Sequence, residues 1–346
     1  MARTPWAPWK PWAPCKPWAP WKPQPRRNPA VRHRGVTGPF TTALLVTAVA
    51  LLTAACAGSQ IIGRAGTGEF GRGVPDRDGW RLVWHDEFDG SELDPAYWNF
   101  DLGDGSVVGI PGWGNNEWQY YTDEEQNVFL RDGRLVIRAV EERRFDAFGS
   151  GRYTSARIVT RGKLAVRYGR IEARMSLPAG RGLWPAFWMM PEPVGLDENP
   201  FARAGVYGGW AASGEIDIME ARGSRPGEVS GAIHYGGEWP NNTYQTRTHR
   251  FAPSRTFIEM NLYAIEWEPG EIRWYVNDEL YFTATDWYSV GPDGTRHDFP
   301  APFDQPFHLI INLAVGGHFD GYPPPDAPYF PAEMEVDFVR IYEPTS

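Results

Sequence analysis

Residues 213–222 read SGEIDIMEAR, and the placing of three acidic residues within this stretch decides the fold. A β-strand directs alternate side chains to opposite faces, so Glu215 and Asp217 share one face. The third acid, Glu220, comes one residue too late to join them. A β-bulge at Ile218–Met219 would add one residue to the strand and return Glu220 to that face. The stretch therefore predicts a bulged strand with three acids in a row along one side.

The predicted row of acids faces the inside of a cleft, while Ile216 on the other side of the strand points into an apolar core. Carboxylates held side by side repel one another, and their pKa values are pushed apart. A solvated edge strand with scattered acids is the alternative. It fits poorly, because the apolar residues here are β-branched and the preceding YGGWAASG carries no charge. Acids gathered in this way do not stabilise a fold, so they indicate a function.

Short apolar-alternating segments, broken by Gly, Pro, Asn and Asp, continue on both sides of this strand. They lie at 81–88, 134–142, 156–162, 163–177, 185–191, 214–222, 231–237, 261–284, 307–317 and 334–344. No helical periodicity of about twelve residues or more stands out. Evenly spaced antiparallel strands predict an all-β fold, a two-sheet antiparallel β-jelly-roll sandwich. A five-bladed propeller is the alternative, but the sequence shows no repeat of blade length.

The chain divides into a basic N-terminal segment and an acidic body. Residues 1–56 hold eight Lys or Arg and no acid, so the other 26 basic and all 43 acidic residues give the body a formal charge of −17. A body this acidic is a poor binder of nucleic acid or of an anionic membrane. Five of the 17 Trp lie in the tail and twelve in the body, which suits a core or a sugar-binding cleft. The body has no cysteine after Cys56, which excludes a disulfide, a thiolate metal site and a Cys nucleophile there.

Residues 5–22 read PWAPWK PWAPCK PWAPWK, a repeat with Pro at every third position. This spacing forbids a helix and favours polyproline II. The repeat is either a recognition or anchoring tail, or a stretch that is never translated because the start codon lies downstream, at Val31 or Val36. We favour the second interpretation.

An export signal is predicted after the repeat. Four arginines within 26–34 precede an uncharged stretch at 40–55, which ends in small residues before Cys56. This order is typical of a signal peptide. The final LTAAC resembles a bacterial lipoprotein signal, with Cys56 as the lipidated residue. We therefore expect an exported protein, either secreted or held in the cell envelope by a lipid on Cys56. The Gly-rich residues 57–77 are predicted to be a flexible linker, and 78–346 the functional domain.

Paired carboxylates are the groups that glycoside hydrolysis needs. One carboxylate attacks the anomeric carbon, while a carboxylic acid protonates the leaving oxygen and later activates water. The spacing of Glu215 and Glu220 permits this retaining mechanism on a curved strand. A two-metal hydrolase is the rival use of clustered acids, but it needs more ligands than His234, which is the one candidate nearby.

The stretch GEIDIMEARG resembles the signature of glycoside hydrolase family 16 in its bulge-containing form. Five other stretches, in the family's order, resemble its laminarinase-like branch. They are VWHDEFDGSELDPAYWNF, GWGNNEWQYYT, GRIEARMSLPAGRGLWPAFWMMP, IHYGG and VDFVRIY. The resemblance covers about residues 80–344 and implies a β-jelly-roll with a concave substrate cleft. It also implies that Glu215 is the nucleophile, Glu220 the acid/base, and Asp217 the partner that hydrogen-bonds Glu215.

The resemblance further implies which residues contact the sugar. The candidate substrate-binding residues are Asn116, Trp113, Arg174, Trp184, Trp188, Trp210 and His234. For each of them a structural role is the alternative: a turn for Asn116, core packing for the tryptophans, an ordinary surface position for Arg174 and a strand position for His234. Trp113 is expected to be exposed in its Gly-rich loop.

A structural Ca²⁺ on the convex side is also implied, held at Glu87, Gly133 and Asp337. Calcium takes oxygen ligands, backbone carbonyls included, so a glycine ligand is reasonable. No cofactor is expected for catalysis.

The resulting prediction is a retaining endo-acting glycoside hydrolase of β-1,3-glucan, working as a monomer on a polysaccharide. The same mechanism on mixed-linkage β-glucan or on a galactan such as agar is the first alternative, and the loops at 192–209 and 318–330 would decide it. A non-catalytic glucan-binding protein is the second alternative. It is disfavoured because the chain keeps all three acids. A transglycosylase is also conceivable, because sugar and water compete for one intermediate.

Overall fold

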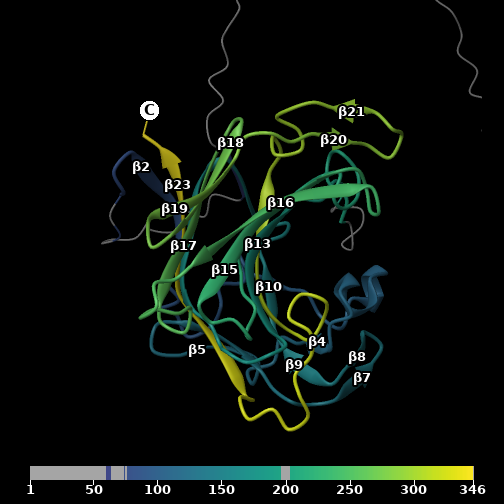
Figure 1. Cartoon of the computed structure of the whole chain (residues 1–346), viewed down its shortest axis with the longest axis vertical. Helices are drawn as coiled ribbons and strands as arrows, with labels where there is room; N and C mark the ends of the chain where they lie inside the picture. Colours follow the sequence, from purple (N-terminus) through teal and green to yellow (C-terminus); the bar gives the residue numbers. More distant parts are fainter. Residues whose placement is uncertain (1–59, 64–73, 75, 196–202, 346) are drawn as a thin grey trace, which may run out of the picture. The chain divides into compact units, whose positions relative to one another are not determined.

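The computed structural model describes residues 60–63, 74, 76–195 and 203–345. The predictions for the repeat, the export signal and Cys56 lie outside these residues. In the described part of the chain, no helix is both long enough and apolar enough to span a membrane. The body is built almost wholly from strands, which form two large sheets (Figure 1). This arrangement confirms the predicted antiparallel sandwich.

The first sheet has eleven strands and carries the acidic stretch on β14 (Glu215–Glu220). Its path runs β1-β11-β22-β13-β14-β15-β20-β21, with β10 beside β22, β3 beside β10 and β16 beside β15. The other strands of this sheet are β1 (Gln60–Gly63), β3 (Asn99–Phe100), β10 (Arg157–Val159), β11 (Leu164–Arg167), β13 (Leu183–Pro191), β15 (Glu228–Gly236), β16 (Asn242–Arg250), β20 (Ser289–Val290), β21 (Arg296–His297) and β22 (Phe307–Val315). The mostly apolar sequence of β22 suits its central place, where all nine residues are buried.

The second sheet has eight strands in the order β19-β18-β17-β12-β23-β6-β5, with β2 beside β23. Their bounds are β2 (Trp80–Asp86), β5 (Val128–Leu130), β6 (Leu135–Ala139), β12 (Gly169–Ser176), β17 (Asn261–Glu268), β18 (Glu271–Val276), β19 (Glu279–Ala284) and β23 (Ala332–Pro344). Two hairpins lie within the predicted segment 261–284, one between β17 and β18 and one between β18 and β19. Asn277 and Asp278 join β18 to β19 with positive φ at both positions, which is the turn that matches strand twist.

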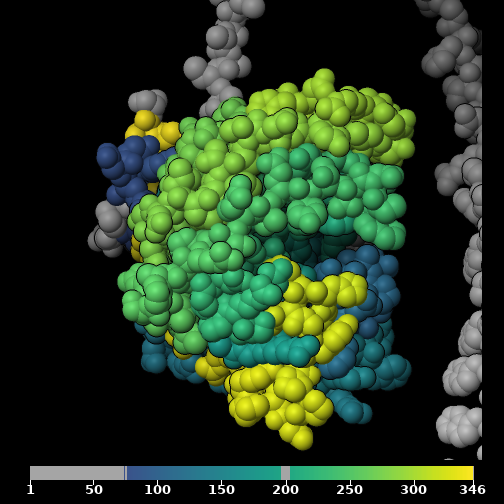
Figure 2. Space-filling model, in the orientation of Figure 1, coloured from purple at the N-terminus to yellow at the C-terminus, as the bar shows by residue number. Residues whose placement is uncertain are grey.

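Smaller elements cap one end of the sandwich. They are the parallel pair β4 (Gln119–Tyr121) and β9 (Tyr153–Ser155), the hairpin β7 (Arg144–Asp146) and β8 (Gly149–Gly151), and the short 3₁₀ turns η1 (Ser106–Val108) and η2 (Pro111–Gly114). In the space-filling view the molecule is hollowed between this blue segment, the green segment that includes β15 and β16, and the yellow segment that follows β22 (Figure 2).

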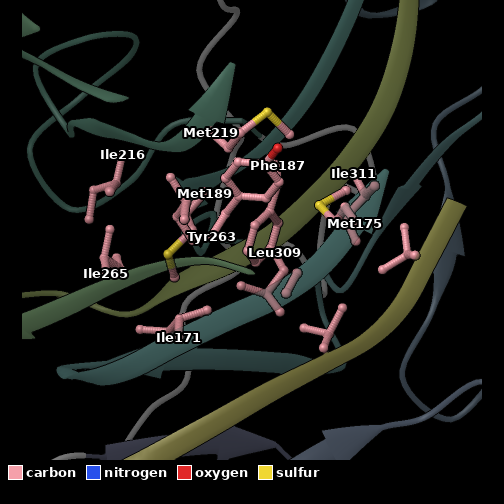
Figure 3. Close-up of a cluster of buried hydrophobic side chains, with 14 of the residues drawn as sticks. Ile171, Met175, Phe187, Met189, Ile216, Met219, Tyr263, Ile265, Leu309 and Ile311 are labelled. Carbon is pink, nitrogen blue, oxygen red and sulfur yellow. The ribbon is translucent and has the colours of Figure 1, made fainter. Parts of the chain in front are cut away.

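The apolar core lies between the two sheets (Figure 3). Ile171 and Met175 of β12 enter it from the second sheet, and Phe187 of β13 and Ile216 of β14 from the first. Burying apolar side chains on one face of each sheet leaves the other face free. The far face of β13, β14 and β22 is therefore the face that turns toward the hollow.

The predicted linker 57–77 differs from the structure in one segment. Residues 60–63 form β1, which pairs antiparallel with β11 over four residues. Ile61 and Ile62 are β-branched and favour a strand, although the surrounding sequence is Gly-rich. At the end of the same segment, Arg77 forms ion pairs with Glu172 and Asp278. The folded body therefore begins before residue 78.

Candidate active site

The bulge predicted in the acidic strand is present in β14. On one side Phe187 pairs with Met219 and Trp188 with Asp217, so Ile218 is the extra residue. On the other side the register with β15 also shifts between Asp217 and Glu220. Ile218 and Met219 are buried in the core, as is Ile216. The bulge therefore lets one strand fill the core and still present all three acids on its opposite face.

Each of the two glutamates is held by a tryptophan. The indole N–H of Trp210 donates to Oε2 of Glu215 at 2.7 Å, and that of Trp184 donates to Oε1 of Glu220 at 3.0 Å. Trp184 lies on β13, and Trp210 lies in the loop before β14. Trp210 remains 37% exposed, so its ring also faces solvent. Two of the four tryptophans predicted to bind substrate thus meet the acids directly.

His234 completes the group from the neighbouring strand β15. Its Nε2 lies 3.4 Å from Oδ2 of Asp217 and 3.8 Å from Oε1 of Glu215. Its ring packs against Trp210 on one side of the site and against Tyr244 of β16, with centroid distances of 5.7 and 5.5 Å. The predicted cleft position of His234 agrees with this geometry.

The electrostatics of the site follow from burial and crowding. Burial, followed by the nearby charge of Asp217, raises the pKa of Glu215 to about 7 and that of Glu220 to about 8. Burial alone would lower the pKa of His234, but its hydrogen bond to Asp217 and the surrounding carboxylates raise it to about 9. Ionising all of these neighbouring carboxyl groups is unfavourable, because their negative charges repel one another. The glutamates therefore retain protons to unusually high pH, and a cationic histidine offsets the remaining charge.

Trp188 and Trp113 lie farther along the cleft floor and share one cation. The guanidinium of Arg157 lies 4.8 Å from the ring centroid of Trp188 and 4.5 Å from that of Trp113. Trp188 also donates its N–H to Oδ1 of Asn312 at 2.7 Å. Trp113 is buried, at 7% exposure, so the expectation of an exposed loop tryptophan is wrong. The guanidinium occupies its ring face, so Trp113 supports Arg157 rather than offering a free stacking surface.

Asn116 lies at the rim, in the loop that leads from η2 to β4. It is exposed, has a positive φ of 56° and donates from Nδ2 to Nε2 of His318 at 2.6 Å. The loop is tied to the end of β22, where Glu117 pairs with Gly316. Asn116 therefore lies on the same side of the sandwich as the acids, as the prediction requires.

Arg174 is not part of this site, and its predicted substrate contact is wrong. It lies on β12 in the second sheet, where it forms an ion pair with Asp337 at 2.6 Å. Its strand neighbours Ala173 and Met175 are buried in the core between the sheets. Since side chains alternate along a strand, Arg174 points away from the core on the sheet that does not carry the acids.

Several residues of the cleft were not identified from sequence. They are Arg157, Asn312, Glu117, Tyr244 and Phe319. Burial raises the pKa of Glu117 to about 7, although its carboxylate accepts hydrogen bonds from Asn115 and Gln119. The strand alternation of SARIVT offered the one sequence signal, since it places Arg157 opposite the apolar Ile158. Phe319 and Tyr244 carry no local pattern that separates them from ordinary surface aromatics.

The residues that could hold a metal fall into two places. Among the described residues, Glu215, Asp217 and His234 form the one group of three acidic, His or Cys side chains whose ligand atoms lie within 4.8 Å of one another. A metal needs a neutral imidazole, whereas these carboxylates favour the cationic form of His234. The group therefore fits direct acid–base work better than metal binding.

The predicted calcium ligands lie on β23 of the second sheet and on the segments next to its neighbours β2 and β6. Glu87 follows β2, Asp337 is on β23, and Gly133 lies in the turn before β6 with a positive φ of 69°. Glu87 pairs with Arg340 at 2.8 Å, and Asp337 pairs with Arg174. The oxygen donors are of the type that calcium prefers, but an ion would have to compete with these arginines.

The fold and the site together define the class of protein. A sandwich that presents two glutamates and an aspartate on the open face of one sheet, with tryptophans on both glutamates, is a hydrolase of glycosidic bonds.

Known proteins agree with this class. The model of glycosyl hydrolases family 16 matches residues 115–321. The glucan endo-1,3-beta-glucosidase A1 of Niallia circulans is 43% identical over 273 residues, which are 77% of this chain but 38% of that protein. The beta-glucanase of Rhodothermus marinus is 44% identical over 266 residues, covering 76% of this chain and 85% of that protein. The endo-β-1,3-glucanase structure from Pyrococcus furiosus aligns with a TM-score of 0.66 at 40% identity, covering 79% of this chain and all of that chain. The chain belongs to glycosyl hydrolase family 16.

Proposed function

We propose that the protein is an endo-acting β-1,3-glucanase that cleaves laminarin-like glucan with retention of anomeric configuration. The observation that carries the proposal is the bulge in β14, which brings Glu215, Asp217 and Glu220 to one open face while Ile218 fills the core. No stabilising role accounts for this arrangement, since among the described residues no arginine forms an ion pair with these carboxyl groups, unlike acids elsewhere in the body.

The reaction follows from the two glutamates. Glu215, once ionised, attacks the anomeric carbon, while protonated Glu220 gives its proton to the glycosidic oxygen of the leaving sugar. A glycosyl-enzyme ester forms on Glu215, and Glu220 then removes a proton from the water that hydrolyses it. The N–H of Trp210 and the charge of His234 stabilise the anionic form of Glu215. The raised pKa of Glu220 keeps this group protonated at neutral pH, as its first task requires.

The choice of β-1,3-glucan rests on relatives. The Niallia circulans and Pyrococcus furiosus proteins are named for action on 1,3-β-glucan, and both are at least 40% identical to this chain. Mixed-linkage glucan and agar-type galactan stay as alternatives that product analysis separates. A purely binding role is disfavoured, because the acids and the tryptophans that hold them are all present.

The subsites are proposed from the cleft geometry. Trp210 offers an exposed ring beside the nucleophile, and Trp184 lies beside the acid/base. Trp188, with Arg157 against its ring, and Asn116 at the rim extend the same surface. Aromatic faces and a few polar groups are the usual lining of a sugar site.

Export and calcium complete the proposal. The basic segment, the uncharged stretch and Cys56 support secretion or attachment to the cell envelope by a lipid. A structural calcium ion would bind at Glu87, Gly133 and Asp337, with oxygen ligands only. Melting the protein with and without EDTA tests the calcium site, because an ion bound to the folded state raises the melting temperature. Sedimentation velocity tests the expected monomer.

The decisive experiment is product analysis of the full chain on laminarin, lichenan and agarose, with Glu215→Ala as the matched blank. Short oligosaccharides from laminarin alone would support the proposal. Cleavage of a galactan and not of laminarin would show that the proposed substrate is wrong and would leave the proposed mechanism in place. Binding of laminarin without any cleavage would support the non-catalytic alternative. Proton NMR of the first product distinguishes retention from inversion.

A further inference from the structure

The bulge in β14 sets the distance between the two glutamates, because Glu215 lies before it and Glu220 after it. In the pairing with β15, the two residues between Asp217 and Glu220 face a single residue, Gly231. A bulge interrupts the ladder of backbone hydrogen bonds, and buried backbone groups beside it need partners from elsewhere. Whatever fixes the bulge therefore also fixes the position of Glu220 relative to Glu215.

One such partner reaches the bulge from the second sheet. The indole N–H of Trp274, on β18, donates to the backbone carbonyl of Asp217 at 2.8 Å. The side chain of Trp274 is fully buried, and its ring stacks on that of Phe282 of β19 with the centroids 4.5 Å apart. The hydrogen bond is thus made in the apolar core, where a carbonyl left without a donor is costly.

The strand beside the bulge leaves room for this indole. A Cβ atom on Gly231 would lie 2.4 Å from Cδ1 and 2.7 Å from Nε1 of Trp274, and 2.7 Å from the hydroxyl oxygen of Tyr281. These distances are too short for non-bonded atoms, so any side chain at position 231 would displace the indole. The glycine of β15 and the tryptophan of β18 therefore fit each other at the bulge.

We propose that Trp274 is a positioning residue of the reaction, which fixes the bulge through the carbonyl of Asp217 and so places Glu220 for proton transfer. The inference rests on the proposed function. A shift of one residue turns a side chain to the opposite face of a sheet, so a bulge that moved along its strand would turn Glu220 away from the cleft. Glu215 lies before the bulge and keeps its pairing with His234. The alternative is that Trp274 only fills the core.

The test uses two substrates that differ in their need for Glu220. Laminarin needs the nucleophile and the acid, whereas dinitrophenyl β-laminaribioside has a leaving group that needs no proton, so its kcat/KM depends on the nucleophile. Trp274→Phe keeps a buried ring and removes the N–H. Its kcat/KM on laminarin should fall by roughly 10- to 100-fold, the range expected when a reacting group is misplaced by about 1 Å. Its kcat/KM on the aryl glycoside should stay at the wild-type value.

Trp267→Phe is the matched control. Trp267 lies on the neighbouring strand β17 and is equally buried, and its indole N–H also donates to a backbone carbonyl, that of Phe303 at 3.2 Å. Its hydrogen bond goes to the loop before β22 rather than to the bulge. Both variants lose the same kind of ring and one buried hydrogen bond, so both should melt at lower temperature. Trp274→Phe alone should separate the two substrates.

Each outcome decides the proposal. Equal falls on both substrates, or no fall on laminarin, would show that Trp274 only fills the core. The same separation in Trp267→Phe would overturn the proposal as well, because it would then report a loosened core. If Trp274→Phe does not fold, Phe282→Leu removes the ring on which the indole stacks and should separate the substrates in the same sense; no separation there overturns the proposal.

The wild type distinguishes this proposal from the proposed function. A wild-type protein inactive on laminarin contradicts the proposed function, and the role of Trp274 with it. An active wild type whose variants treat the two substrates alike contradicts the role of Trp274 alone.

Discussion

The outer face of the second sheet and the concave face of the first both carry many acids, but they surround them differently. On the outer face Glu172 is fully buried, and it accepts hydrogen bonds from Arg170 at 2.9 Å and from Arg77 at 2.8 Å. On the concave face Asp217 is also buried, but its nearest charged partner is His234 at 3.4 Å, and two further carboxyl groups lie beside it.

The difference separates acids that stabilise from acids that react. A buried carboxylate with arginines on it is balanced by their positive charge and contributes nothing to chemistry. Carboxyl groups that share one histidine hold protons to higher pH and can both give and take them. Acidic residues therefore stabilise the fold on the second sheet and take part in the reaction on the first. The charged partners of each acid show which role it has.

The largest effect is expected when a reacting acid of the concave face is removed. Glu215→Ala and Glu220→Ala should each lower laminarin hydrolysis by about 10⁴-fold or more, since each removes a group that reacts. Melting temperatures should not fall, because removing one of several crowded carboxyls relieves repulsion. Glu220→Ala should keep much of its kcat/KM on dinitrophenyl laminaribioside, whose leaving group needs no proton, while kcat falls because no base activates the water that hydrolyses the glycosyl-enzyme. A Glu220→Ala variant that hydrolyses laminarin at the wild-type rate would contradict the acid/base role.

The next largest effect is expected when a buried acid of the outer face is removed. Glu172→Ala removes the buried carboxylate that Arg170 and Arg77 share and leaves them the more exposed Asp278, and removal of one member of a buried pair costs about 3–5 kcal/mol. Chemical denaturation should show this loss, while kcat on laminarin measured well below the melting temperature stays at the wild-type value. A fall in kcat without a fall in stability would show that the two faces are not separate in function.

The pH dependence sharpens the comparison. Activity should fall on the acid side as Glu215 becomes protonated and on the alkaline side as Glu220 loses its proton, with apparent pKa values near the raised values of about 7 and 8. The free energy of unfolding should also fall as pH rises. The folded pKa of Glu220 exceeds its ordinary 4.5, so its contribution is present below pH 4.5 and is lost as pH rises through about 8. On the aryl substrate, whose leaving group needs no proton, kcat/KM of the wild type should lack this alkaline limb, and in Glu220→Gln the loss of stability should shrink. Denaturation midpoints between pH 5 and 9 provide the measurement.

The smallest effect is expected for Arg174→Ala. Its ion pair with Asp337 lies at the surface, with the arginine side chain 44% exposed, so its removal should cost less than about 0.5 kcal/mol. Laminarin hydrolysis should not change. A clear rise in KM would restore Arg174 to the substrate site and undo the assignment of this face as purely structural.

Sequence predicted the acidic strand well because two rules act on it at once. Strand alternation fixes the phase of Glu215 and Asp217, and a bulge is the simplest way to recover Glu220. No such rule separates Arg174, which was predicted to bind substrate, from Arg157, which was not. Both lie in alternating segments, and alternation does not say to which sheet a strand belongs. That is set by pairing with β22 for one and with β23 for the other, which are distant in the chain.

Two other misses have different causes. The strand β16, NTYQTRTHR, is almost wholly polar and, within the described residues, pairs with β15, so it lacks the apolar alternation by which its neighbours β14 and β15 were found. Trp113 was expected to be exposed because its loop is Gly-rich. Its burial depends on Arg157, 44 positions later, and on a ring contact with Tyr121. Long-range contacts of this kind leave no mark on the sequence nearby.

The early strand β1 would keep the enzyme close to a membrane if the proposed lipid on Cys56 is present. If Cys56 carries a lipid, four residue steps separate it from Gln60, where β1 begins. Four fully extended steps span at most about 14 Å. Such a tether is shorter than the body it holds, so while β1 stays paired with β11 the cleft could sample only a thin layer beside the bilayer. A lipidated form would thus act on glucan that reaches the cell surface, whereas a form cleaved free of Cys56 would also act on glucan away from the cell.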